Sequence, residues 1–172
     1  MPKLQQDSEC ISHGANLLIS ILVRYPEIGT VNYDAEAGTI NLTFMVSGNP
    51  APEELRAIQD RLLSSIEAYH VLEGLTGGGA DVRCSACDSV AMLTLRRDMD
   101  TLSRGEIALV IALLKEALQD RLVADDNDAI LEEDLLVQDE VIGTMLESMR
   151  KDHSGNGLIG IREDGRVLVF NK

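Results

Sequence analysis

The chain has 172 residues and a formal net charge of −14, from 29 acidic and 15 basic side chains. Such a charge repels phosphate backbones and anionic lipid surfaces, so we expect neither nucleic acid nor a membrane as a partner. The longest apolar run, residues 107–114, is far shorter than the roughly 20 residues that cross a bilayer. Because there are three cysteines and no secretory signal pattern, we expect a cytosolic protein.

The chain opens with a helical pattern that two strand-like runs follow. Apolar residues recur every three or four positions from Ser8, a good N-cap, to Pro26, where the helix must end. Residues 28–33 and 39–46 come next, and the second run alternates apolar and polar side chains. Alternation is typical of a strand with one buried face, so the two runs predict a β-hairpin.

A second helix and hairpin repeat this order. Pro52 and the two glutamates after it predict a helix start, and the helical pattern continues to about Glu73. The glycines of residues 77–79 lack the spacing of a phosphate-binding loop, so we expect a flexible connector there. Residues 81–86 and 89–97 then predict the second hairpin.

The last third of the chain predicts two helices and a third hairpin. Ser103 and Glu106 have the spacing of a capping box, which indicates a helix start. Residues 107–114 are all apolar, so this helix must be buried on more than one side. A fourth helical pattern is best defined over residues 139–150, and Asp164-Gly165 is a strong turn signal for the last hairpin.

Hairpins form antiparallel sheet and each helix has an apolar face to bury, so the sequence predicts an α+β fold with helices layered on a mostly antiparallel sheet. We expect a ferredoxin-like arrangement of residues 8–100 with an appended helix-hairpin. We divide the chain into an α+β core domain (1–124), an acidic connector (125–138), and a module of one helix and one β-hairpin packed on the core (139–172).

One pattern uses all three cysteines and suits a metal. The candidate ligands are Cys10, His13, Cys84 and Cys87. Three sulfurs and one imidazole are a stoichiometry found in structural zinc sites. Ligands three residues apart converge on a turn or a helix end but point to opposite faces of a strand. The zinc site therefore needs Ser85-Ala86 to be the turn of the second hairpin; otherwise Cys84 and Cys87 are ordinary strand residues and we expect no cofactor.

Residues 10–69 also resemble the heavy-metal-associated domain, in which a Cys-x-x-Cys motif opens a helix and a proline, a hairpin and a second helix follow. The matching segments are Cys10-Ile-Ser-His13, Tyr25-Pro-Glu-Ile28, Val31-Asn-Tyr-Asp34 and Pro52-Glu-Glu-Leu55. The resemblance implies a ferredoxin-like fold with metal ligands at Cys10 and His13. Here His13 stands where the family has its second cysteine.

No catalytic motif is present: the histidines are separated, and His70 and His153 are expected at the surface. Scattered carboxylates leave an enzyme as one alternative, although we expect none. The function that we expect is a non-catalytic interaction domain that self-associates or binds a protein partner. Its basis is the apolar third helix and the contrast between residues 119–140, with net charge −8, and residues 150–172, with net charge +2. A zinc-binding structural protein is the other alternative.

Overall fold

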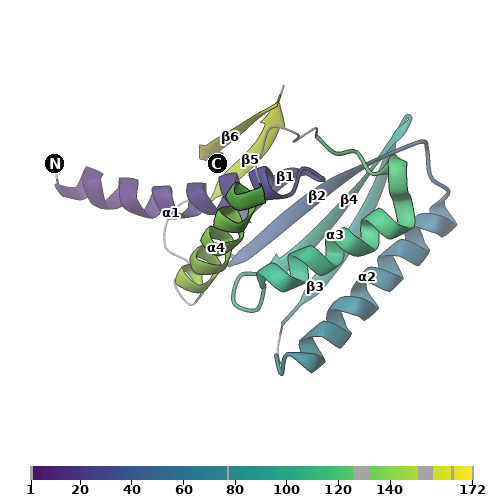
Figure 1. Cartoon of the computed structure of the whole chain (residues 1–172), viewed down its shortest axis with the longest axis horizontal. Coiled ribbons are helices and arrows are strands. Elements are labelled where there is room, and N and C mark those ends of the chain that lie inside the picture. Colours follow the sequence, from purple (N-terminus) through teal and green to yellow (C-terminus); the bar gives the residue numbers. More distant parts are fainter. Residues whose placement is uncertain (1, 77, 126–131, 151–156, 164, 172) are drawn as a thin grey trace.

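The computed structural model describes residues 2–76, 78–125, 132–150, 157–163 and 165–171, with the backbone alone for residues 2–12. The chain folds into four long helices, one short 3-10 turn and six strands in these described parts (Figure 1). In chain order they are α1 (Pro2–Arg24), β1 (Ile28–Asp34), β2 (Thr39–Ser47), α2 (Pro52–Leu72), β3 (Ala80–Cys87), β4 (Val90–Asp98), α3 (Arg104–Leu118), η1 (Gln119–Arg121), α4 (Glu132–Met149), β5 (Leu158–Glu163) and β6 (Arg166–Asn171).

The six strands form a single sheet in the order β3-β4-β2-β1-β5-β6, and every neighbouring pair is antiparallel. The α+β class and the antiparallel sheet expected from the sequence are confirmed, and each of the three predicted hairpins forms. The third hairpin pairs with the first, because Tyr33 of β1 lies opposite Leu158 of β5. The last strands of the chain therefore extend the common sheet.

The sheet has two different faces. On β2, Ile40, Leu42, Phe44 and Val46 are fully buried, whereas the alternating residues from Thr39 to Ser47 are only half-buried. The helices lie over the buried side, as Figure 1 shows. We call this side the helical face and the other side the open face. All large buried apolar side chains of the described residues belong to one core on the helical face.

Helix α3 is the central helix of the layer. Ile107, Val110 and Leu114 are fully buried, and α3 packs on both α2 and α4. Within the apolar run, Ala108 and Ala112 are its exposed residues. The prediction that this helix is buried on more than one side is confirmed, and its apolar composition is explained by packing within the chain. No described helix is both long and apolar enough to span a bilayer.

Two helices begin earlier than the sequence pattern suggested. Helix α1 starts at Pro2, before Ser8, and α4 starts at Glu132, before residue 139. The first turn of α4 holds Glu132, Glu133 and Asp134. Negative side chains at a helix N-terminus interact favourably with the exposed N–H groups and the helix dipole. Part of the predicted acidic connector is therefore helical.

Arg162 of β5 ties the third hairpin to the first helix. Its Nη2 donates to the backbone oxygens of Leu22 at 2.5 Å and Ile28 at 3.0 Å, and also to that of Tyr25. Its Nη1 lies 3.6 Å from the Asp125 carboxylate. The side chain is 12% exposed. A cation that hydrogen-bonds the last carbonyls of a helix stabilises the helix end, so Arg162 anchors β5.

We predict that Arg162→Ala lowers the free energy of unfolding by about 2 kcal/mol, because it leaves carbonyl groups at the end of α1 without their charged donor. Chemical denaturation measures the change. Arg166→Ala is the matched control, since Arg166 is exposed on the same hairpin, and we expect it to change the stability by no more than about 0.5 kcal/mol. Equal effects of the two substitutions would contradict the anchoring role of Arg162.

Candidate functional site

The structure does not bring the predicted zinc ligands together where it describes them. Cys84 and Cys87 both lie within β3, and the second hairpin turns at Asp88-Ser89 instead of Ser85-Ala86. His13 is exposed on α1, and the side chain of Cys10 lies outside the described residues. Among the side chains that are described, no three or more His, Cys, Asp or Glu residues form a group that would hold a metal.

The register of β3 explains why the two thiols diverge. Cys84 lies opposite the buried Leu93 and packs against the core, and burial raises the pKa of its thiol. Cys87 is three residues further along the strand and is exposed. Side chains three residues apart leave an extended strand on opposite faces, so Cys84 and Cys87 cannot bind one metal ion in this conformation.

A buried cluster around Arg97 is the densest group of charges in the described structure. Arg97 is fully buried near the end of β4. Its Nε donates to Glu106 Oε2 at 2.5 Å, and its Nη2 donates to Glu106 Oε1 at 2.9 Å. The same guanidinium donates to the Gly79 carbonyl oxygen, to Asp98 and to Thr101. All five N–H groups of the guanidinium therefore have acceptors.

Glu106 and His70 complete this cluster from two helices. The His70 Nε2 lies 2.5 Å from Glu106 Oε1 and 2.9 Å from Arg97 Nη2, so the tautomer of the ring decides whether Nε2 donates to the carboxylate or accepts from the guanidinium. Glu106 is fully buried and His70 is 9% exposed. The surface position expected for His70 from the sequence is therefore wrong: the residue faces inward from the last turn of α2.

The sequence signal for Glu106 was only partly right. Ser103 caps α3 as predicted, since its hydroxyl oxygen accepts from the Glu106 N–H at 3.3 Å. The Glu106 carboxylate does not return to the cap; it pairs with Arg97. A capping box and a buried ion pair both need a glutamate at this position. The one further signal was Arg97, because it falls on an apolar position in the alternation of its strand.

The glycine connector between α2 and β3 is held by the same cluster. Asp98 accepts from the Gly79 N–H at 3.1 Å and from the Thr101 hydroxyl, and Arg97 donates to the Gly79 oxygen. A side chain at residue 78 would collide with Thr101. Burial acts to raise the pKa of Asp98, but hydrogen bonds from Thr101 and Arg97, with the Arg97 charge, hold this pKa below its usual value. Gly79 is thus hydrogen-bonded through both its N–H and its C=O, whereas residue 77 of the expected flexible connector lies outside the described residues.

The chemistry of the cluster is that of a structural tie. Next to the cluster lies a hollow of about 330 Å³. Among the described residues of the cluster, His70 is the one that lines this hollow. The other lining side chains are mostly apolar, and Glu67 adds one carboxylate. No described nucleophile lines the hollow, and both Glu106 oxygens are already occupied. The arrangement therefore joins α2, α3, β4 and the connector without presenting a reactive group.

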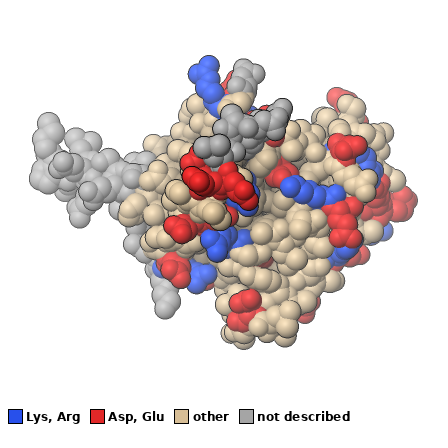
Figure 2. Space-filling model, viewed as in Figure 1, with Lys and Arg blue, Asp and Glu red and all other residues tan. Residues whose placement is uncertain are grey.

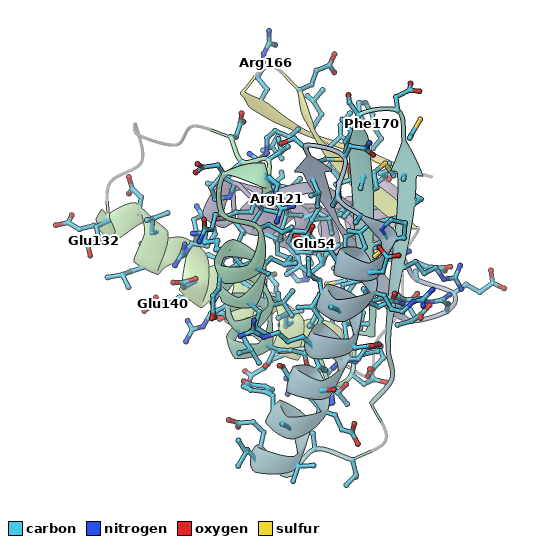
Figure 3. The ribbon with its side chains drawn as sticks, turned by 90° about the vertical axis from the view of Figure 1, so that its right-hand side faces the viewer. Glu54, Arg121, Glu132, Glu140, Arg166 and Phe170 are labelled. Atoms are coloured by element: carbon cyan, nitrogen blue, oxygen red, sulfur yellow. The ribbon has the colours of Figure 1, made fainter. Side chains whose placement is uncertain are left out.

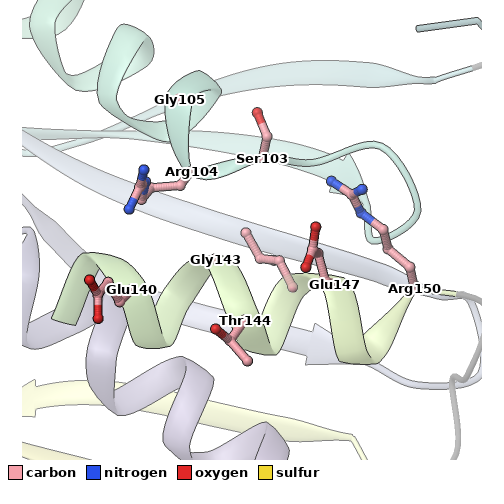
Figure 4. A pocket seen from close by; sticks show the side chains of 9 residues that line it. Ser103, Arg104, Gly105, Glu140, Gly143, Thr144, Glu147 and Arg150 are labelled. Atoms are coloured by element: carbon pink, nitrogen blue, oxygen red, sulfur yellow. The ribbon is translucent and has the colours of Figure 1, made fainter. Parts of the chain in front are cut away.

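A larger hollow, of about 470 Å³, lies between the start of α3 and one side of α4 (Figure 4). Arg104 and Arg150 contribute positive charge, whereas Glu140 and Glu147 contribute negative charge. The two signs cancel, so the hollow does not favour an anion or a cation. Arg150 also donates to the Leu102 carbonyl oxygen, which gives it a structural contact.

The open face of the sheet carries the largest surface without a covering helix. Its central strands present threonine and asparagine together with charged side chains and the apolar pair Met45 and Met92; for example, Thr43 and Thr94 lie side by side with their hydroxyls 3.4 Å apart. The outer strands β5 and β6 present apolar side chains instead. Ile159 lies opposite Phe170, and Ile161 lies opposite Leu168. We call Ile159, Ile161, Leu168 and Phe170 the outer cluster.

The outer cluster is apolar surface that the fold leaves accessible. Phe170 is 50% exposed and its three neighbours are half-buried. Ile159 and Ile161 lie directly opposite Asn32 and Thr30 of β1, so the outer cluster borders the polar side chains of β1. The view in Figure 3 shows Glu132 and Glu140 of α4 on one side of the molecule and Phe170 on the other. A contiguous exposed apolar patch often marks an interaction site.

We predict that Arg97→Met lowers the free energy of unfolding by about 3–5 kcal/mol, because it leaves the Glu106 charge buried without its partner. The matched control is Arg96→Met. Arg96 immediately precedes Arg97 in β4, is exposed and lies on the open face, so its loss costs little. Denaturant unfolding measures both. Similar destabilisation by the two substitutions would contradict the structural role of the cluster.

The positions of Cys84 and Cys87 predict that protein purified without chelator contains less than one zinc ion per chain. Elemental analysis of the purified protein measures the metal content. Cys84→Ser and Cys87→Ser are the comparison, and we expect the same metal content for both and for the native chain. One zinc per chain that either substitution removes would restore the four-ligand site.

Comparisons of this chain with known protein families, with curated proteins and with solved structures find no match. Its function is therefore inferred from its own residues. The described structure offers a closed structural cluster around Arg97, a hollow of mixed charge beside α3, and an open sheet face with an apolar end. Of these, the open face has side chains that are both accessible and free to contact another protein.

Proposed function

We propose that this protein is a non-catalytic interaction domain that self-associates, and that the outer cluster is its contact surface. The observation that carries the proposal is the position of Phe170, half-exposed and apolar, among three further apolar side chains on an uncovered sheet face. Aromatic side chains, including phenylalanine, are enriched at protein interfaces relative to the rest of the surface.

The charge distribution favours this face over the rest of the surface. Two copies of a chain with net charge −14 repel one another. The described open-face positions hold three arginines and four carboxylates, a net charge of only −1; these are Arg83, Arg96, Arg166, Asp34, Asp81, Asp98 and Glu163. Charged groups also lie across the helical side, which Figure 2 views. Copies that meet at the open face therefore experience less repulsion than copies that meet elsewhere.

The third helix supports self-association less than its composition suggested. Its large apolar side chains face α2, α4 and the sheet, and Ala108 and Ala112 are the residues of the apolar run left at the surface. The third hairpin offers more accessible large apolar side chains than α3 does. That hairpin is held rigidly, because Arg162 fixes β5 to the end of α1.

We also infer a ferredoxin-like layout for residues 8–100, in a rearranged form. Strands β2 and β3 are joined through α2 and lie on either side of β4, which makes a split β-α-β unit. Strand β4 is the last strand of residues 8–100, yet in the sheet it occupies the position that the first strand has in the ferredoxin-like fold. The strand order supports this layout and leaves the β5–β6 hairpin as the addition.

Light scattering over a range of protein concentrations tests the proposed function. We predict that the apparent mass rises above 18.7 kDa as the concentration increases. Phe170→Lys should hold the protein near that mass, because it replaces the exposed apolar ring of the outer cluster with a positive charge. The matched control is Leu72→Lys, since Leu72 is an exposed apolar residue, at 85%, in the last turn of α2. It should associate like the native chain.

The experiment has two outcomes that overturn the proposal. A native protein that stays at 18.7 kDa at every concentration does not self-associate. If Phe170→Lys and Leu72→Lys instead associate equally, the contact surface lies away from the outer cluster. Circular dichroism of both variants verifies that they are folded, which both should be because each replaces an exposed side chain.

A further inference from the structure

The two edges of the sheet are not equally protected. At the β3 edge, Asp81 and Arg83 form an ion pair, and Gln59 of α2 donates to the Val82 carbonyl oxygen at 2.5 Å. At the β6 edge, residues 167–170 are Val-Leu-Val-Phe, and no described strand pairs with the far side of β6. An apolar edge strand with unpaired N–H and C=O groups is a template for another strand.

The hairpin turn determines which backbone groups of β6 face this free edge. Two residues separate Glu163 from Arg166, and the residues that flank such a turn form a hydrogen-bonded pair. Hydrogen-bonded and non-hydrogen-bonded pairs then alternate along the hairpin. Leu168 and Phe170 therefore bond to β5, whereas the N–H and C=O groups of Val167 and Val169 point outward.

The same alternation holds at the other edge of the sheet. The β3–β4 hairpin also has two residues in its turn, between Cys87 and Val90. Counting back from Cys87 places the Val82 carbonyl on the outward side of β3. That is the carbonyl to which Gln59 donates, so the alternation agrees with an observed contact.

We propose that β6 pairs antiparallel with β6 of a second copy of this chain, in a register centred on Leu168, so that two six-stranded sheets become one. This inference rests on the proposed self-association and specifies its geometry. The outward groups of Val167 then hydrogen-bond those of Val169 in the second copy, and the symmetry repeats this bonded pair on the other side of the axis.

Side chains also match in this register on both faces of the sheet. On the open face, Leu168 meets Leu168 of the second copy, and Arg166 lies opposite the ring of Phe170, where a guanidinium gains a cation–π contact. On the helical face, Val167 meets Val169, and both are half-buried apolar residues. The two outer clusters become one continuous apolar surface. No acidic side chain of β6 has to approach another.

A second copy fits this edge better than an unrelated strand does. A two-fold axis pairs a strand with the same strand of the other copy in antiparallel orientation. Each outward N–H and C=O group of one β6 then meets its hydrogen-bond partner on the other β6. Five residues of each β6 strand pair in this register, residues 166–170, and they bury less area than the roughly 1,200 Å² of a stable interface. We therefore expect a dissociation constant on the order of 10 μM or weaker.

Proline substitution tests the backbone pairing. Val169→Pro removes an N–H that points outward and leaves the bonds to β5 intact, and proline is tolerated on an edge strand. We expect it to weaken self-association roughly tenfold or more in sedimentation experiments. Ala86→Pro is the matched control, because the alternation rule makes its N–H point outward at the β3 edge. It should associate like the native chain.

Disulfide cross-linking tests the register independently of any effect that proline has on folding. Leu168 faces its own copy as a non-hydrogen-bonded pair, for which the Cα separation is about 4.5 Å, within reach of a disulfide. Leu168→Cys should therefore give a covalent dimer on non-reducing gels after mild oxidation. Phe170→Cys is the control: it lies opposite Arg166 in this register and should not cross-link, and the native chain controls for the existing thiols.

The outcomes separate this proposal from the proposed function. Edge pairing is overturned while self-association stands if the native chain self-associates but Val169→Pro associates as strongly as Ala86→Pro. The same conclusion follows if the Phe170→Cys variant cross-links as readily as the Leu168→Cys variant. If the native chain is monomeric at all concentrations, both proposals are overturned. Loss of association in Val169→Pro together with selective cross-linking of Leu168→Cys supports the paired edge.

Discussion

The buried Arg97 guanidinium is the constraint on which the arrangement of α2, α3 and the connector depends. A charged group out of water costs several kcal/mol unless every donor is paired. Here the acceptors come from Glu106 of α3, the Gly79 carbonyl, and the Asp98–Thr101 turn, and Glu106 also binds His70 of α2. A shift of any one segment would leave a buried charge unpaired. The cluster therefore favours this one arrangement over other compact packings of the same apolar side chains.

The two adjacent arginines of β4 show how the strand separates structural and surface roles. Arg97 lies on the helical face with the core residues Leu93 and Leu95, and Arg96 is exposed on the open face. The pleat sends neighbouring side chains to opposite faces. Because the helices cover one face only, the open face keeps the polar side chains of β1 and apolar ones at the β5–β6 end.

Local signals in the sequence predicted most of the elements but not how distant segments meet. Alternation along residues 39–46 and the Asp164-Gly165 turn are local, and the hairpins that they predicted are present. The pairing of β1 with β5 joins segments more than a hundred residues apart, and no short pattern encodes it. The second hairpin turns at Asp88-Ser89, and this displacement places Cys84 and Cys87 on a strand. The burial of Glu106 and His70 was not predicted. A glutamate at this spacing is equally typical of a helix cap, and a histidine at the end of a helix is equally typical of the surface.

The third hairpin combines a fixed inner strand with an open outer strand, and this combination suits association. Arg162 bonds β5 to the end of α1, and the pairing of β5 with β1 holds the strand in the sheet. Strand β6 inherits this order through its ladder with β5, while its other edge stays unpaired among the described strands. Ordering a flexible segment on binding costs conformational entropy, whereas a strand that is already extended and in register avoids that cost. A short apolar edge such as residues 167–170 can then contribute to binding with few new contacts.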